Sequence, residues 1–138
     1  MDLTGLAPGA LELGIDLIER QLRPAAILLY GSGAAGRLQA ASDVDLAVLA
    51  GGVPVDGFAV ASLRVELSAL LQRDVDLVIL DTASPVLAME VLRNHRVLRN
   101  PRPGLLERFV VRTLSTYFDL KQVRRPIEAA LLRPQVRR

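Results

Sequence analysis

The chain contains no cysteine and no tryptophan, and its 138 residues include a single histidine. Without cysteine it can form neither a disulfide framework nor a thiolate metal site. The lone histidine, His95, excludes a metal site built from several imidazoles, and we expect it on the surface, in a turn after a helix. Any metal ion would therefore depend on oxygen ligands.

Two further absences concern targeting. No apolar run approaches the ~18 residues that a membrane-spanning helix needs. Residues 1–14, MDLTGLAPGALELG, carry two acidic residues and no basic one, which is unlike a secretory signal. We therefore expect a soluble, cytoplasmic protein. With 51% apolar residues, a chain of this length should form one compact domain over residues 1–138.

Charge is unevenly distributed along the chain. Residues 1–92 hold five arginines against twelve acidic residues, a net charge of −7. Residues 93–138 hold eleven arginines and the only lysine, Lys121, against three acidic residues, a net charge of +9. This basic segment indicates an acidic partner or nucleic acid. A solvated helix face, with arginine stems covering apolar surface, explains it equally well.

Apolar periodicity and helix-breaking residues predict a mixed α/β domain, with a small sheet flanked by helices. Asp56 and Ser84 are expected N-caps, and Pro126 should separate the last two helices. The predicted strands cover residues 25–30, 43–49 and 74–80, with a short edge strand at 96–98. The predicted helices cover residues 9–23, 57–72, 84–93, 105–123 and 127–132, and another could begin within 33–38.

The residues most suggestive of chemistry surround the second predicted strand. Gly31 and Ser32 form a turn after the first strand, where backbone amides and a hydroxyl could meet a phosphate, although most such turns are only turns. Asp43 and Asp45 share one face of the second strand, ~6.5 Å apart along the backbone. Two carboxylates this close repel each other unless a cation lies between them.

The third predicted strand repeats the acidic pattern. Asp74 and Asp76 precede the apolar run that ends this strand, just as Asp43 and Asp45 precede theirs. If the strands are neighbours, three carboxylates could hold two metal ions ~3.5–4 Å apart. Asp74 and Asp76 share a face, so side-chain parity cannot choose between them. We favour Asp76 because it lies deeper in the strand, and we place Asp74 at the rim.

These residues carry a resemblance to a known family. Gly31-Ser32, ten residues and Asp43-x-Asp45 match the GS-x10-DxD signature of the DNA polymerase β-like nucleotidyltransferases. Nearly the whole chain resembles a minimal nucleotidyltransferase, the antitoxin encoded beside a HEPN-domain toxin. The likeness includes SPVLAMEVLRNHRVL at 84–98 and YFDLK at 117–121. It implies the polymerase β-like fold, with C-terminal helices from about residue 105.

The resemblance also implies an activity. Gly31 and Ser32 would hold the phosphates of ATP, while Asp43, Asp45 and Asp76 would act as catalytic residues and ligands of two Mg²⁺ ions. AMP would pass to a tyrosine of the partner HEPN toxin (AMPylation), and this modification would silence the toxin. Membrane binding is not implied, and direct nucleic-acid binding is the weaker alternative for the basic tail.

The phosphate loop departs from the family pattern. Family members commonly carry GSRARG, whereas this chain reads GSGAAGR and lacks the basic residues at 33 and 35. We assign Arg37 as their partial replacement at the nucleotide. The altered loop also leaves open a catalytically weak or inactive antitoxin that blocks its partner sterically. A small-molecule nucleotidyltransferase is less consistent with the short chain, because such enzymes add a second domain.

Overall fold

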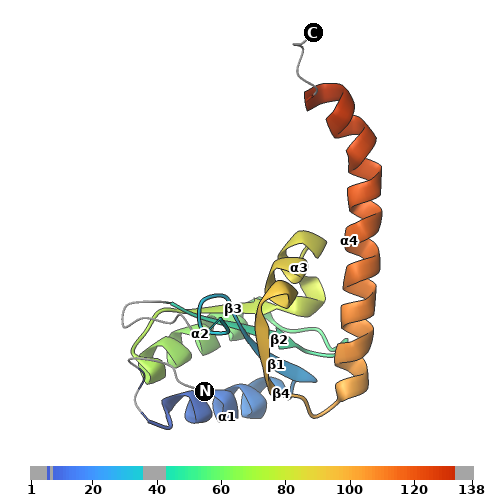
Figure 1. The fold of residues 1–138 in the computed structure, drawn as a ribbon. Helices are drawn as coiled ribbons and strands as arrows, with labels where there is room; N and C mark the ends of the chain where they lie inside the picture. The colour runs from blue at the N-terminus through green and yellow to red at the C-terminus, as the bar shows by residue number, and fades with distance from the viewer. Residues whose placement is uncertain (1–5, 7, 36–42, 133–138) are drawn as a thin grey trace.

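The structure consists of one sheet covered by helices on both faces (Figure 1). The computed structural model describes Leu6, residues 8–35 and residues 43–132, with side chains described as far as Asp119. The elements follow in the order α1 (Ala10–Leu22), β1 (Ala26–Tyr30), β2 (Val44–Leu49), α2 (Gly57–Leu71), β3 (Val75–Ile79), the 3₁₀ turn η1 (Leu80–Thr82), α3 (Pro85–Arg93), β4 (His95–Arg99) and α4 (Pro103–Leu132).

The four strands form a mixed sheet in the order β3-β2-β1-β4. β1 lies antiparallel to both β2 and β4, whereas β2 and β3 are parallel. Parallel neighbours need a crossover connection, which α2 provides here. The prediction of a small mixed sheet flanked by helices is confirmed.

Each face of the sheet has its own hydrophobic core. On one face, Ile15 and Ile18 of α1 and Leu63 and Leu67 of α2 pack against alternate strand residues. On the other face, α3 and α4 contribute Ala88, Val91, Leu106 and Phe109. Because strand side chains alternate between faces, Asp45 projects toward the α3/α4 face together with Ala47 and Leu49.

Helix starts follow the local sequence signals. Asp56 caps α2 by accepting a hydrogen bond from the Phe58 amide, and Ser84 caps α3 by accepting one from the Leu87 amide. Both predicted N-caps are therefore confirmed.

In the parts of the chain that the structure describes, no helix combines the length and apolar character that crossing a membrane requires.

Three local predictions need correction. α4 is a single helix through Pro126, because a proline removes only one backbone N–H from the hydrogen-bond ladder and the helix continues on both sides. Residues 31–35 form turns and not the start of a helix, and the rest of 33–38 lies outside the described residues. His95 is the first residue of β4, where it is half-buried with Nδ1 2.8 Å from the Leu92 carbonyl oxygen.

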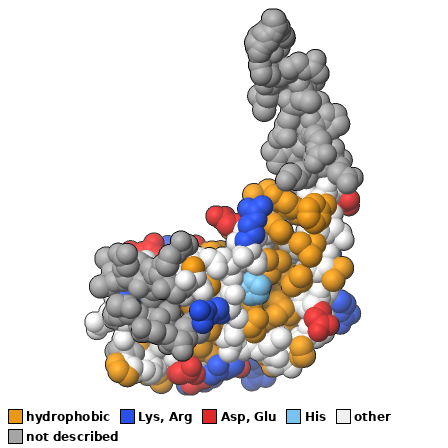
Figure 2. Space-filling model, in the orientation of Figure 1, with side chains coloured by type: hydrophobic (Ala, Val, Ile, Leu, Met, Phe, Trp, Pro, Cys, Tyr) orange, Lys and Arg blue, Asp and Glu red, His pale blue; other side chains and the backbone are white. Residues whose placement is uncertain are grey.

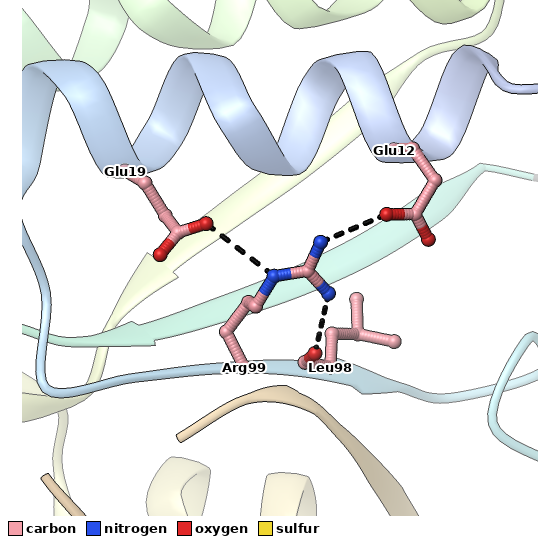
Figure 3. A network of polar contacts seen from close by, with 4 residues as sticks. All are labelled: Glu12, Glu19, Leu98 and Arg99. Atoms are coloured by element: carbon pink, nitrogen blue, oxygen red, sulfur yellow. Dashed lines mark hydrogen bonds and ion pairs between the residues drawn. The ribbon is translucent and has the colours of Figure 1, made fainter. Parts of the chain in front are cut away.

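An arginine on the edge strand β4 ties α1 to the sheet (Figure 3). Arg99 lies between two glutamates of α1, with Nη2 2.8 Å from Oε2 of Glu12 and Nε 3.4 Å from Oε1 of Glu19. Its Nη1 donates to the Leu98 carbonyl at 2.9 Å. The pairs are solvent-accessible, so they orient α1 more than they stabilise the fold.

A second carboxylate organises the loop after β2. Asp81, in the 3₁₀ turn, accepts hydrogen bonds from the backbone N–H groups of Ala50, Gly51 and Gly52 at 2.6, 3.0 and 3.0 Å. Gly51 and Gly52 have φ angles of 89° and 94°, in the region that favours glycine. Asp81 therefore fixes the end of β2 opposite to Asp45.

The long helix α4 rises away from the sheet beyond its first turns (Figure 1). Hydrophobic side chains gather over its described part (Figure 2). Val111 and Phe118 are 64% and 51% exposed, well above the level of core residues. Exposed apolar side chains on a projecting helix suit contact with another protein.

Candidate functional site

Two of the predicted carboxylates meet at one end of the sheet. In the parallel register of β2 and β3, Asp45 lies directly beside Asp76. Both project to the α3/α4 face, because Asp45 alternates with Ala47 on β2 and Asp76 with Val78 on β3, and these apolar residues pack on that face. Neighbouring strands are about 4.8 Å apart, so the structure brings these two acidic residues into one site.

The other two aspartates lie just outside the paired strands. Asp43 precedes β2 and Asp74 precedes β3, and both are exposed. The Asp74 carbonyl oxygen accepts a hydrogen bond from the Val44 amide at 2.9 Å, which continues the pairing of β2 and β3. Asp74 thus lies two residues before Asp76, just ahead of the start of β3.

Tyr30, the last residue of β1, also reaches this acidic site. It is the cross-strand partner of Asp45, and its hydroxyl reaches past β2 to donate to Asp76 Oδ2 at 3.0 Å. Burial, and then the charge of Asp76, raise the pKa of the Tyr30 hydroxyl well above its ordinary value. The hydroxyl therefore stays protonated and serves as a hydrogen-bond donor to the carboxylate.

Tyr30 is also a core residue, since it is 8% exposed and packs in the hydrophobic cluster on the α3/α4 face of the sheet. Its hydrogen bond to Asp76 was not foreseen. The two residues are 46 positions apart, so only the strand order could have indicated the contact.

The glycine turn lies against the Asp45 carboxylate. Gly31 has φ 71°, and a Cβ added there would lie 2.5 Å from Asp45 Oδ2. Real Cβ atoms do not approach other atoms closer than about 3.0 Å, so any other residue at 31 would displace the Asp45 carboxylate. The turn is closed by the Ala35 amide, which donates to the Gly31 carbonyl at 3.2 Å, and half-buried Ser32 lies within it.

An arginine from the opposite edge of the sheet supports the same turn. Arg96 of β4 donates from Nε to the Ala34 carbonyl oxygen at 2.9 Å. Sequence reasoning missed this contact, and the only signal was the position of Arg96 in the expected edge strand. The predicted nucleotide ligand Arg37 lies outside the described residues.

The site concentrates negative charge. Burial raises the pKa of Asp45, and the charges of Asp76, Asp43 and Glu90 raise it further. Glu90 lies on α3, and nothing in its sequence context indicated that it would be near the strand acids. Repulsion among carboxylates is what a divalent cation relieves, so the donor chemistry fits a hard metal ion such as Mg²⁺.

The carboxylates do not form a complete metal cage by themselves. Among the described residues, no three acidic or histidine side chains are grouped closely enough to hold an ion alone. Mg²⁺ in proteins is commonly held by one or two carboxylates together with substrate phosphates. This arrangement suits a site in which a nucleotide supplies the remaining ligands.

Comparison with known proteins gives consistent relationships. The polymerase β nucleotidyltransferase family matches residues 14–102. The protein adenylyltransferase MntA of Shewanella oneidensis is 38% identical over 101 residues, which cover 73% of this chain and 71% of the relative.

Solved structures share the fold over nearly the full length. A crystal structure of a toxin–antitoxin with AMP-PNP has a TM-score of 0.76 and 34% identity, covering 86% of this chain and 94% of that one. A complex of a tri-AMPylated Shewanella oneidensis HEPN toxin with an MNT antitoxin has a TM-score of 0.68 and 32% identity, covering 88% and 98%. With its paired strand carboxylates and glycine turn, the chain belongs to the polymerase β nucleotidyltransferase family.

Proposed function

We propose that this protein is an Mg²⁺-dependent adenylyltransferase that transfers AMP from ATP to a tyrosine of a HEPN-domain toxin and thereby acts as its antitoxin. The observation that carries this proposal is the pairing of Asp45 with Asp76 beside the Gly31 turn. The relatives support it, since one is a protein adenylyltransferase and another is bound to an AMPylated HEPN toxin. A cytoplasmic location is part of the proposal, because ATP would be the AMP donor.

The chain's own residues would align the two reactants. Gly31 and Ser32 would receive the terminal phosphates, because a turn without a Cβ lets them approach the backbone. The acceptor tyrosine oxygen attacks the α-phosphorus, the bond from that phosphorus to the bridging oxygen breaks, and pyrophosphate leaves. Asp76 would favour loss of the hydroxyl proton, and Tyr30 would keep Asp76 oriented. Such alignment accounts for much of the catalysis of group transfer.

The metal would be held by Asp43, Asp45 and Asp76, with two Mg²⁺ ions as the expected number. When bound, Mg²⁺ supplies neutralisation of the charge on the phosphate oxygens. The chain keeps Asp45 partly buried beside the Gly31 turn, where a bound cation would relieve the repulsion from the neighbouring acidic residues.

Label transfer from α-³²P-ATP to the HEPN protein encoded nearby, in the presence of Mg²⁺, tests the proposal. We expect Asp43→Asn with Asp45→Asn to reduce transfer by at least 100-fold, because both changes remove a charge from the metal site. Asp76→Asn should do the same. Asp74→Asn is the matched control, since this exposed aspartate occupies the equivalent place one step out on β3. Equal transfer by all four proteins would refute the proposal.

A second function follows from a different observation. The loop lacks arginines at 33 and 35, and α4 exposes Val111 and Phe118 to a potential partner. A non-catalytic antitoxin would block the toxin through this helix. Toxin neutralisation in cells by the Asp43→Asn, Asp45→Asn variant would favour this alternative, whereas loss of protection would favour AMP transfer.

A further inference from the structure

A cavity of about 500 Å³ lies at the end of the sheet opposite to the acidic site. It is bounded by Leu49 at the end of β2, by Pro85 at the start of α3, and by the first turns of α4. Asp45 is four residues before Leu49 on the same strand, roughly 13 Å away. The volume falls in the range typical of small-molecule sites, and none of the acidic site residues lines the cavity.

Two cationic side chains line this cavity from α4. Arg108 and Arg112 are one helical turn apart and therefore lie on the same helix face. Among the described residues neither forms an ion pair, and the hydrogen bond from Arg108 Nε to the Gly104 carbonyl is long, at 3.4 Å. Pro85 and Ala88 of the nine-residue helix α3 also line the cavity, so the positive end of its dipole adds to the two charges.

A buried hydroxyl without a partner lies in the same wall. Thr113 is only 6% exposed, and within the described part of the chain its side chain makes no hydrogen bond. Leaving a buried hydroxyl unpaired carries an energetic penalty. A ligand that accepts this hydrogen bond removes the penalty, and Thr116 provides a second hydroxyl nearby.

The one acidic residue in the lining, Asp81, offsets part of this charge. Both carboxylate oxygens of Asp81 are engaged by backbone N–H groups of the loop after β2. The remaining walls include the apolar side chains of Leu80, Leu105 and Phe109. The cavity thus combines two guanidinium groups, one carboxylate held by backbone amides, two hydroxyls and an apolar surface.

We propose that this cavity binds a small phosphate monoester whose organic group is apolar. Arginine suits phosphate because it donates two parallel hydrogen bonds to it. Two arginines attract a doubly charged phosphate ligand more strongly than a ligand with a singly charged carboxylate. The apolar group would lie against Phe109 and Leu105. The proposal is independent of the AMP-transfer reaction, because the cavity shares no residue with the acidic site.

Phenyl phosphate is the probe, titrated into the full chain in EDTA and followed by amide chemical shifts and calorimetry. We expect binding at one site, at least 10-fold tighter than inorganic phosphate or phenol, with shifts at Thr113. Arg112→Ala should weaken binding at least 10-fold. Arg20→Ala, an exposed arginine on α1, is the control and should bind as the unaltered protein does. An equal affinity of Arg112→Ala and the unaltered chain would overturn the proposal, as would no binding.

Two further variants test the hydroxyl contact independently of Arg112 and show which site binds the phosphate. Thr113→Val preserves side-chain volume, so a folded variant with several-fold weaker binding supports the hydroxyl contact even if Arg112→Ala fails to fold. Asp45→Asn should leave phenyl phosphate binding unchanged. A change of affinity in Asp45→Asn, in either direction, would place the phosphate in the nucleotide site and end the proposal.

Discussion

Replacing Gly31 by alanine should damage catalysis far more than stability. The backbone at Gly31 is left-handed, with φ 71°, and an alanine in that region is about 1–2 kcal/mol less stable. The new Cβ also meets Asp45 Oδ2, and their separation must widen from 2.5 Å to at least 3.0 Å. Catalytic groups tolerate displacements of only about 0.5 Å, and larger ones can reduce rates about 100-fold. We therefore expect AMP transfer to fall about 10- to 100-fold.

Gly9 provides the matched control for this substitution. Its φ of 80° is similar, yet a Cβ added there has nothing within 4 Å. Gly9→Ala should therefore lose about the same 1–2 kcal/mol of unfolding free energy while AMP transfer stays within about twofold. Urea unfolding and label transfer to the HEPN protein, measured on both variants, separate the two effects. Full activity in a folded Gly31→Ala protein would refute the placement of this turn against a working carboxylate.

The other predictions concern single carboxylates and their partners. Tyr30→Phe removes the donor to Asp76 and should raise the Mg²⁺ concentration for half-maximal AMP transfer about 10-fold; an unchanged Mg²⁺ dependence contradicts this role. Burial and neighbouring acids raise the pKa of Asp45 in the folded chain. The resulting contribution to the free energy of unfolding is present below the ordinary aspartate pKa of ~3.9. It is lost as the pH rises through the raised pKa of the folded state. Melting temperatures in EDTA should fall over that interval, and Asp45→Asn should flatten the fall. Asp81→Ala leaves three backbone N–H groups without an acceptor and should lower the unfolding free energy by about 1–3 kcal/mol, with a smaller loss for Asp81→Asn in the same urea titration.

The main elements of the fold follow from local sequence. The strands at 26–30, 44–49 and 75–79 are short apolar runs, interrupted only by Asp45 and Asp76, so composition and length identified them. The caps at Asp56 and Ser84 were also readable, because a side-chain acceptor before a helix has a local role. The continuity of α4 through Pro126 could not be predicted from the sequence, because a proline lowers local helix stability but does not by itself decide where a long helix ends.

The site was predictable only in part, because side-chain contacts depend on strand order. The spacing of Gly31, Ser32, Asp43 and Asp45 indicated the start of β2, where the Gly31 turn lies beside Asp45. The hydrogen bond from Tyr30 to Asp76 requires that β2 lie between β1 and β3, which no local pattern specifies. The support that Arg96 gives to the Ala34 carbonyl likewise depends on β4 joining the far edge.

The assembly of one polar centre from three strands has a consequence for synthesis. Tyr30, Asp45 and Asp76 meet only when β1, β2 and β3 have paired, and the first and last of these residues are 46 positions apart. A nascent chain on the ribosome therefore has no such centre until β3 has emerged and joined the sheet, since contacts this distant in sequence form only after loop closure. If the proposed function holds, protection by a newly made molecule begins with that docking event, and slow docking of β3 would delay it.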